Sequence, residues 1–148
     1  MKKIQSIAIL LLMVINGLSF AVEKPATYQP DTGDTILDES LVLINKTITN
    51  KPGKKATRKL NQYTQRLAAD FQIPEYRVEE LFDIYEFTAA DALMSVSIAD
   101  VSGQPLKNVA GLYFNNKKAG WKAVFKQLMI TPGSRVYEQI RKDAAAEY

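Results

Sequence analysis

The 148-residue chain contains no cysteine and no histidine. Without cysteine it has no thiol nucleophile and no thiolate ligand for zinc or an iron–sulfur cluster. Without histidine it lacks the base of Ser-His-Asp and Cys-His catalysis and the commonest ligand of transition metals. These absences exclude two large classes of enzymes, and we expect neither a metal nor a cofactor. Because no disulfide can form, packing alone has to stabilise the fold.

Long apolar runs are scarce, and the one clear example lies at the N-terminus. Lys2 and Lys3 form a basic start, residues 7–15 are apolar, and Ser19-Phe20-Ala21 is a small-x-small cleavage site. This pattern predicts a signal peptide over residues 1–21 and an exported, periplasmic protein. A transmembrane anchor is the alternative. A span needs about 20 predominantly apolar residues, whereas this run is interrupted by Gln5, Asn16 and Gly17.

Removal of the signal peptide also changes the charge of the protein. The full chain carries 19 basic and 16 acidic residues, a net charge of +3. Loss of Lys2 and Lys3 leaves 17 basic against 16 acidic residues, a net charge of +1. The basicity of the whole chain is therefore weak evidence for a nucleic-acid partner.

Apolar periodicity, capping residues and Pro/Gly breakers predict an all-α fold. We expect about seven short helices, packed as consecutive helical hairpins in a single domain over residues 35–148. A flexible N-terminal arm, residues 22–34, precedes this domain. The run Leu41–Ile44 could also form a strand, but no partner strand is evident. The helices are expected at residues 35–49, 57–71, 74–87, 88–101, 105–114, 119–129 and 135–147.

The segment from Val78 to Ile130 has two halves with similar apolar spacing. Five pairs of residues stand 28 positions apart without a gap, which suggests two consecutive helix-turn-helix units stacked on one another. The pairs are Leu81 and Val109, Ile84 and Leu112, Tyr85 and Tyr113, Leu93 and Trp121, and Val96 and Val124.

The second unit contains the sequence GWKAVFKQLMI, residues 120–130, followed by Pro132-Gly133. It resembles a bacterial pattern in which Gly-Trp opens a helix that ends in Lys-x-Leu-Gly-Val/Ile. The pattern is found in a group of exported, uncharacterised helical proteins built from short helical hairpins, and the resemblance covers roughly residues 78–133. Met129 stands where the pattern has glycine, which departs from the expected helix-ending turn. The resemblance implies the fold and no activity.

DNA binding and carboxylate catalysis are both open to a chain without histidine or cysteine. Residues 67–74 and 124–132 resemble the first helix and turn of a DNA-binding helix-turn-helix. A reading helix must be basic, but the helix that follows is acidic in the first case and mixed in the second, so we expect no nucleic-acid partner. Paired carboxylates can cleave glycosidic bonds, yet nothing in the sequence indicates that any candidate is buried. The candidates are Glu79, Glu80, Asp83, Glu86, Asp91 and Asp100.

Charge is segregated between the two units. Residues 75–86 are net acidic, whereas residues 107–126 carry five lysines and no acid. The two surfaces either pair across a seam, or the basic one docks an acidic envelope protein or surface through aromatic and cationic anchors. The candidate binding residues are Tyr113, Lys117, Lys118, Trp121 and Lys122. Trp121 is also in phase with Val124 and Leu128, which fits a core position.

The sequence therefore predicts a non-catalytic exported protein that binds another macromolecule through a charge-segregated helical surface. It has no integral membrane span after signal cleavage, and its oligomeric state is open. The alternative is a carrier of a small apolar or anionic ligand held between helices near Tyr85, Tyr113 and Trp121. A carboxylate-based hydrolase comes third.

Overall fold

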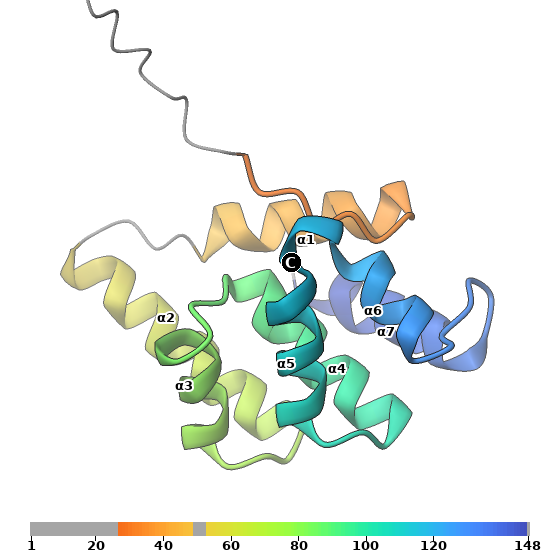
Figure 1. The fold of residues 1–148 in the computed structure, drawn as a ribbon. Helices are drawn as coiled ribbons and strands as arrows, with labels where there is room; N and C mark the ends of the chain where they lie inside the picture. The colour runs from red at the N-terminus through yellow and green to blue at the C-terminus, as the bar shows by residue number, and fades with distance from the viewer. Residues whose placement is uncertain (1–26, 49–52, 148) are drawn as a thin grey trace, which may run out of the picture.

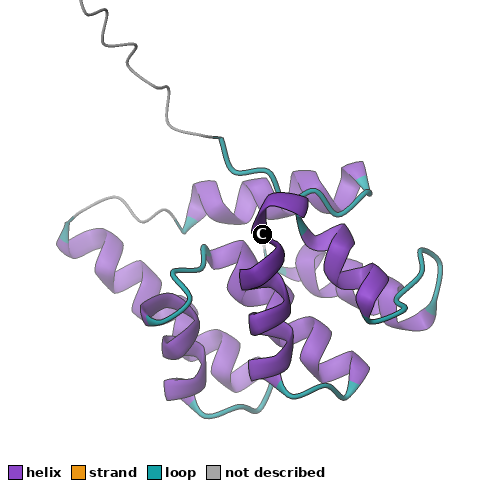
Figure 2. Ribbon diagram, in the orientation of Figure 1, coloured by secondary structure: helices purple, strands orange, loops and turns teal. Residues whose placement is uncertain are grey.

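Seven α-helices and one short 3-10 helix form the part of the chain that the computed structural model describes, residues 27–48 and 53–147. This part contains no strand, and the predicted all-α, single-domain fold is confirmed (Figure 1, Figure 2). The elements are α1 (Thr35–Thr47), α2 (Lys54–Asp70), α3 (Glu75–Asp83), α4 (Ala89–Ser102), α5 (Leu106–Asn116), η1 (Lys117–Ala119), α6 (Trp121–Gln127) and α7 (Arg135–Ala146).

Helix α4 is the centre of the domain. Every residue from Ala89 to Ile98 is buried, and α1, α2, α3, α5 and α7 all pack against this helix. The helix is built from small and apolar residues on all sides, and a helix of that kind is buried all round.

Capping side chains place the starts of α1, α4 and α7 within one residue of the predicted positions. The Thr88 hydroxyl accepts the Asp91 N–H at 3.2 Å, and an Asp91 carboxylate oxygen accepts the Thr88 N–H at 3.3 Å. These two hydrogen bonds form a capping box, with aspartate in place of the usual glutamate. Asp34 caps α1 and Ser134 caps α7 through hydrogen bonds to backbone N–H groups. Gly103 ends α4 in the left-handed conformation, with φ of 69°.

The two predicted units correspond to the hairpins α3–α4 and α5–α6. In three of the five pairs both members are buried: Leu81 with Val109, Leu93 with Trp121, and Val96 with Val124. Ile84 differs from its counterpart Leu112, because its side chain is 65% exposed. Helix α3 ends at Asp83, one residue before Ile84, whereas α5 continues through Asn116.

Residues 27–34, here called the strap, pack against the helical domain. The Trp121 and Lys122 N–H groups at the start of α6 donate to the Pro30 and Asp31 carbonyls, both at 2.9 Å. The strap thus satisfies N–H groups that a helix start leaves without a partner. We expected a flexible arm over residues 22–34, and the packing of residues 27–34 differs from that expectation.

Residues 22–26 of the expected arm and the predicted signal peptide, residues 1–21, lie outside the described residues. Within the described part, none of the helices has the length and apolar character needed to cross a membrane.

Candidate functional site: the groove between α3 and α5

Two of the predicted surface anchors, Tyr113 and Trp121, lie in the core. Their side chains are 4% and 0% exposed, and their rings stack with centroids 3.9 Å apart and planes 6° from parallel. Buried rings cannot touch a partner unless the domain opens. Of the two interpretations of Trp121, the structure shows the core position, and Tyr113 and Trp121 do not form an exposed aromatic surface.

Asp91 explains why Trp121 is held inside. Its Oδ1 accepts hydrogen bonds from the Tyr28 hydroxyl at 2.8 Å and from Trp121 Nε1 at 3.1 Å. Its Oδ2 accepts from the Thr88 hydroxyl at 2.9 Å and, in the capping box, from the Thr88 N–H. Burial, followed by the negative charge of Asp91, raises the pKa of both Tyr28 and Tyr113. The tyrosine hydroxyls therefore keep their protons, and Tyr28 acts as a donor.

The candidate carboxylates do not form a catalytic pair among the described residues. Asp91 is the buried member of the six, at 3% exposure, and its oxygens are occupied by the donors just named. Glu79, Asp83, Glu86 and Asp100 are exposed, and Glu80 is half-buried. No group of three or more acidic residues in the described part could hold a metal ion.

The three predicted binding lysines are exposed, but they do not contact the same part of the structure. Lys122 pairs with Asp31 of the strap at 2.8 Å. Lys117 donates to the Tyr85 carbonyl at 3.2 Å, and its ammonium lies 5.5 Å from the centre of the Phe114 ring. Lys118 forms no ion pair within the described residues. Lys117 and Lys118 thus stand beside α5, whereas Lys122 belongs to the strap contact.

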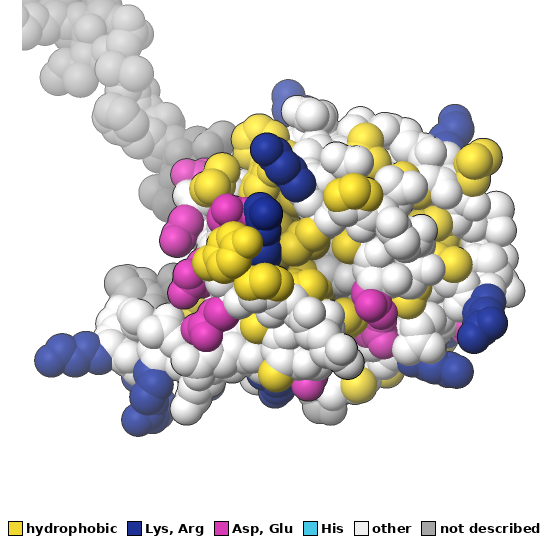
Figure 3. All heavy atoms as spheres, turned by 90° about the horizontal axis from the view of Figure 1, so that it is seen from below, with side chains coloured by type: hydrophobic (Ala, Val, Ile, Leu, Met, Phe, Trp, Pro, Cys, Tyr) yellow, Lys and Arg dark blue, Asp and Glu magenta, His cyan; other side chains and the backbone are white. Residues whose placement is uncertain are grey.

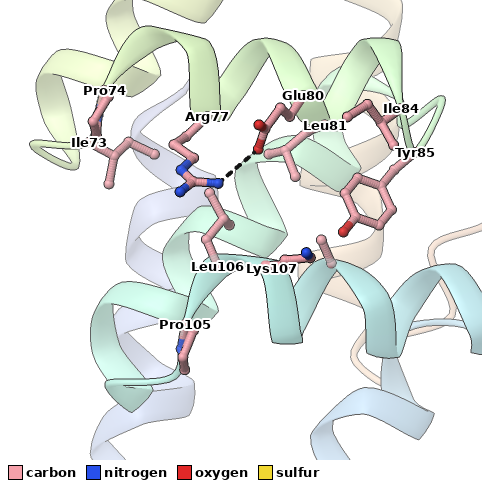
Figure 4. A pocket seen from close by; sticks show the side chains of 11 residues that line it. Ile73, Pro74, Arg77, Glu80, Leu81, Ile84, Tyr85, Pro105, Leu106 and Lys107 are labelled. Atoms are coloured by element: carbon pink, nitrogen blue, oxygen red, sulfur yellow. Dashed lines mark hydrogen bonds and ion pairs between the residues drawn. The ribbon is translucent and has the colours of Figure 1, made fainter.

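An open groove of about 510 Å³ lies between α3 and α5, the first helices of the two hairpins (Figure 4). Both helices pack against α4, which positions them side by side. Leu81, Ile84 and Tyr85 extend from α3 and the turn after it, while Leu106 extends from α5. Ala110 of α5 also lines the groove. Ile73, Pro74, Arg77, Glu80, Pro105 and Lys107 complete the lining.

Large apolar side chains remain exposed along this groove. Ile84 is 65% exposed and Phe114 is 49% exposed. Phe114 meets the edge of the Tyr85 ring, with centroids 5.8 Å apart, so both exposed residues lie at the same end of the groove. A cluster of apolar side chains left in water is characteristic of an interaction site.

Charge is segregated between the two hairpins that border the groove, although Arg77, Glu80 and Lys107 are the charged residues that line it. The acidic row consists of Glu79, Glu80, Asp83 and Glu86 on α3 and the turn after it. The basic row consists of Lys107, Lys117 and Lys118 on α5 and η1. Figure 3 shows acidic side chains in a line beside a group of hydrophobic side chains, with basic side chains next to them. Arg77 and Glu80 pair within α3 at 3.2 Å.

The two rows do not form the seam that was one of the alternatives. None of the ion pairs among the described residues joins α3 to α5. Of the charged residues that line the groove, Arg77 and Glu80 pair with each other, and Lys107 forms no ion pair within the described residues. No protein-family model, curated protein or solved structure matches the chain.

Proposed function

We propose that this is a non-catalytic binding protein whose α3–α5 groove receives an apolar segment of another macromolecule. The observation that carries the proposal is the exposure of Ile84 in a mainly apolar groove, with exposed Phe114 packed beside the groove residue Tyr85. Covering a large apolar side chain that stands in water stabilises a complex by about 1–2 kcal/mol. A groove between two helices is also the usual receptor for an amphipathic helix.

Export to the periplasm remains part of this proposal. It is supported by the basic and apolar start of the chain and by the small-x-small sequence Ser19-Phe20-Ala21. In that compartment the partner is an envelope protein or another exported chain.

Carriage of a small ligand is the second candidate, and the size of the groove favours it. Its volume of about 510 Å³ falls in the range of ligand sites, roughly 300–1,000 Å³. The sequence predicts a ligand near Tyr85, Tyr113 and Trp121. Tyr113 and Trp121 are stacked in the core, whereas Tyr85 lines the groove, so we propose the groove as the ligand site. Lys107 would receive the carboxylate of an aliphatic acid. Calorimetric titration with decanoate tests this candidate, and binding that disappears in Lys107→Ala would support it.

Capture experiments with one matched pair of variants test the leading proposal. Ile84→Asp places a charge at the groove, whereas Ile36→Asp places the same charge on α1, at a side chain of nearly equal exposure, 62%. Immobilised wild-type protein and Ile36→Asp should recover the same partner from envelope extract, and Ile84→Asp should lose it. Equal recovery by all three proteins would contradict the proposal.

A further inference from the structure

We infer that the exposed side of α2 docks the protein on a lipid bilayer that contains anionic phospholipids. The docking surface, here called the α2 basic face, consists of Lys54, Lys55, Arg58 and Lys59. It shares no residue with the lining of the α3–α5 groove, and it therefore adds a second surface to the one in the proposed function. An anionic lipid surface is the partner that fits its position, its charge and its composition.

The α2 basic face lies outside the core. Residues three and four positions apart lie on the same side of a helix, so the four cations form one patch, and all four are exposed. Residues 54–62 include no buried residue, so this half of α2 extends past the core. The start of α2 lies at the edge of the molecule in Figure 1, and Figure 3 shows basic side chains without acidic ones at that end. This position leaves the patch accessible to an extended surface.

No acidic residue balances the charge of the α2 basic face. The sequence from residue 40 to residue 69 contains neither aspartate nor glutamate. None of the four cations forms an ion pair within the described residues. Lys59 donates instead to the neutral carbonyl of Thr47, at 3.4 Å. The positive charge of the patch is therefore left for a negative partner.

The placement of the cations opposes the dipole of their own helix. The start of a helix carries a partial positive charge, so acidic residues are favourable there and basic residues are not. The first turn of α2 contains no acid, and its N-cap, Gly53, provides no capping side chain. By contrast, α1, α4 and α7 each have an acid in the first turn and a capping side chain. A local rule broken without a gain in stability indicates a functional contact.

The composition of the patch favours lipid over protein or single-stranded nucleic acid. Protein interfaces have an apolar centre and few lysines, whereas the exposed neighbours of the four cations are Thr57, Asn61 and Gln62. Single-stranded nucleic acid binds to aromatic side chains by stacking, and residues 53–62 contain none. Lysine ammonium groups on flexible stems suit the many phosphates of a bilayer. Each basic residue near an anionic bilayer strengthens binding by about 5-fold.

Co-sedimentation of the full chain with lipid vesicles tests the inference. Vesicles of phosphatidylcholine with phosphatidylglycerol are anionic, and vesicles of phosphatidylcholine alone are neutral. The wild-type protein should bind the anionic vesicles more tightly, and added salt should weaken this binding because it screens the lipid charge. Lys54→Glu with Lys55→Glu should lower the association constant for anionic vesicles by about 25-fold or more. Residues 1–21 are the same in both proteins, so the difference comes from α2.

Stability and net charge are controlled separately. Glutamate at the start of α2 agrees with the helix dipole, so Lys54→Glu with Lys55→Glu should melt at or above the wild-type temperature by circular dichroism. Lys126→Glu with Arg135→Glu changes the net charge by the same amount. These two residues flank the loop between α6 and α7, away from the start of α2 (Figure 1). This control should bind anionic vesicles within about three-fold of wild type.

Three results would overturn the inference. The first is equal binding of the wild-type protein to anionic and neutral vesicles. The second is an equal loss of binding in the two double variants, which would assign the effect to net charge alone. The third is tighter binding to a DNA duplex than to anionic vesicles at equal phosphate concentration, which would assign the α2 basic face to nucleic acid.

Discussion

Replacement of Asp91 by alanine should be the most destabilising single change at the centre of the domain. The substitution removes the acceptor of the buried Trp121 Nε1–H, of the Tyr28 hydroxyl and of the Thr88 side of the capping box. A buried donor left without a partner costs about 1–3 kcal/mol, and loss of a cap costs about 1 kcal/mol. With about 2 kcal/mol for Trp121 and about 1 kcal/mol for each of the others, the expected loss is about 4 kcal/mol. Domains are commonly stable by only about 5–15 kcal/mol.

Urea unfolding, followed by the fluorescence of the single tryptophan and by circular dichroism, measures this loss directly. Asp100→Ala is the matched control, because Asp100 is an exposed acid on the same helix. It should change the free energy of unfolding by less than about 0.5 kcal/mol. Asp91→Asn keeps one acceptor oxygen, so its free energy of unfolding should lie between those of Asp91→Ala and Asp100→Ala. An Asp91→Ala variant within about 1 kcal/mol of wild type would refute the role given to Asp91.

Two further predictions concern the strap and the tyrosines. Gly120→Ala should lower the free energy of unfolding by about 3 kcal/mol or more, because Gly120 has φ of 70° and a Cβ there would lie 2.5 Å from the Asp31 Cβ. In Gly111→Ala the added Cβ meets nothing within 4 Å. This control should raise the free energy of unfolding by about 0.5–1 kcal/mol in the same urea assay. Burial, with the charge of Asp34, raises the pKa of Tyr137 to about 12. Its stabilising contribution is present below the unfolded value of about 10 and is lost as pH rises through the folded value, so Tyr137→Phe should flatten the decline in stability between pH 10 and 12. Identical slopes for the variant and wild type would contradict this assignment.

The local features of the fold could be predicted from the sequence because they depend on residues close together in the chain. Asp34, Thr88 and Ser134 are cap residues, and each bonds to N–H groups only two or three positions away. The full burial of α4 could not be predicted in the same way. Its many alanines and serines give no clear apolar face, so periodicity does not indicate how many sides are covered.

A left-handed turn ends α6 even though the glycine of the related pattern is missing. Met129 adopts φ of 54°, and the Ile130 N–H bonds to the Phe125 carbonyl at 2.8 Å. The turn expected from the Lys-x-Leu-Gly pattern therefore forms with methionine in the glycine position. This conformation is strained for a side chain other than glycine, and the 86% exposure of Met129 avoids any further clash.

The candidate site was predicted less well because it depends on contacts between distant residues. The hydrogen bond that fixes Trp121 comes from Asp91, 30 positions earlier, and no local pattern predicts that pairing. The repeat pairs Ile84 with Leu112, but the end of α3 at Asp83 leaves Ile84 in water. The sequence predicts a flexible arm at the strap because its partners, the N–H groups of α6, are about 90 residues away and give no local signal. Gly120 was the available signal, since glycine immediately before a helix allows close approach of another segment.

Photo-crosslinking in living cells tests most directly whether the α3–α5 groove is the binding surface. A photoreactive amino acid replaces Ile84 in one protein and Ile36 in the control, two isoleucines of nearly equal exposure on different helices. We predict that illumination yields a covalent adduct with another protein from position 84 and none from position 36. No adduct from position 84, or equal yields from both positions, would contradict the groove as the site of binding.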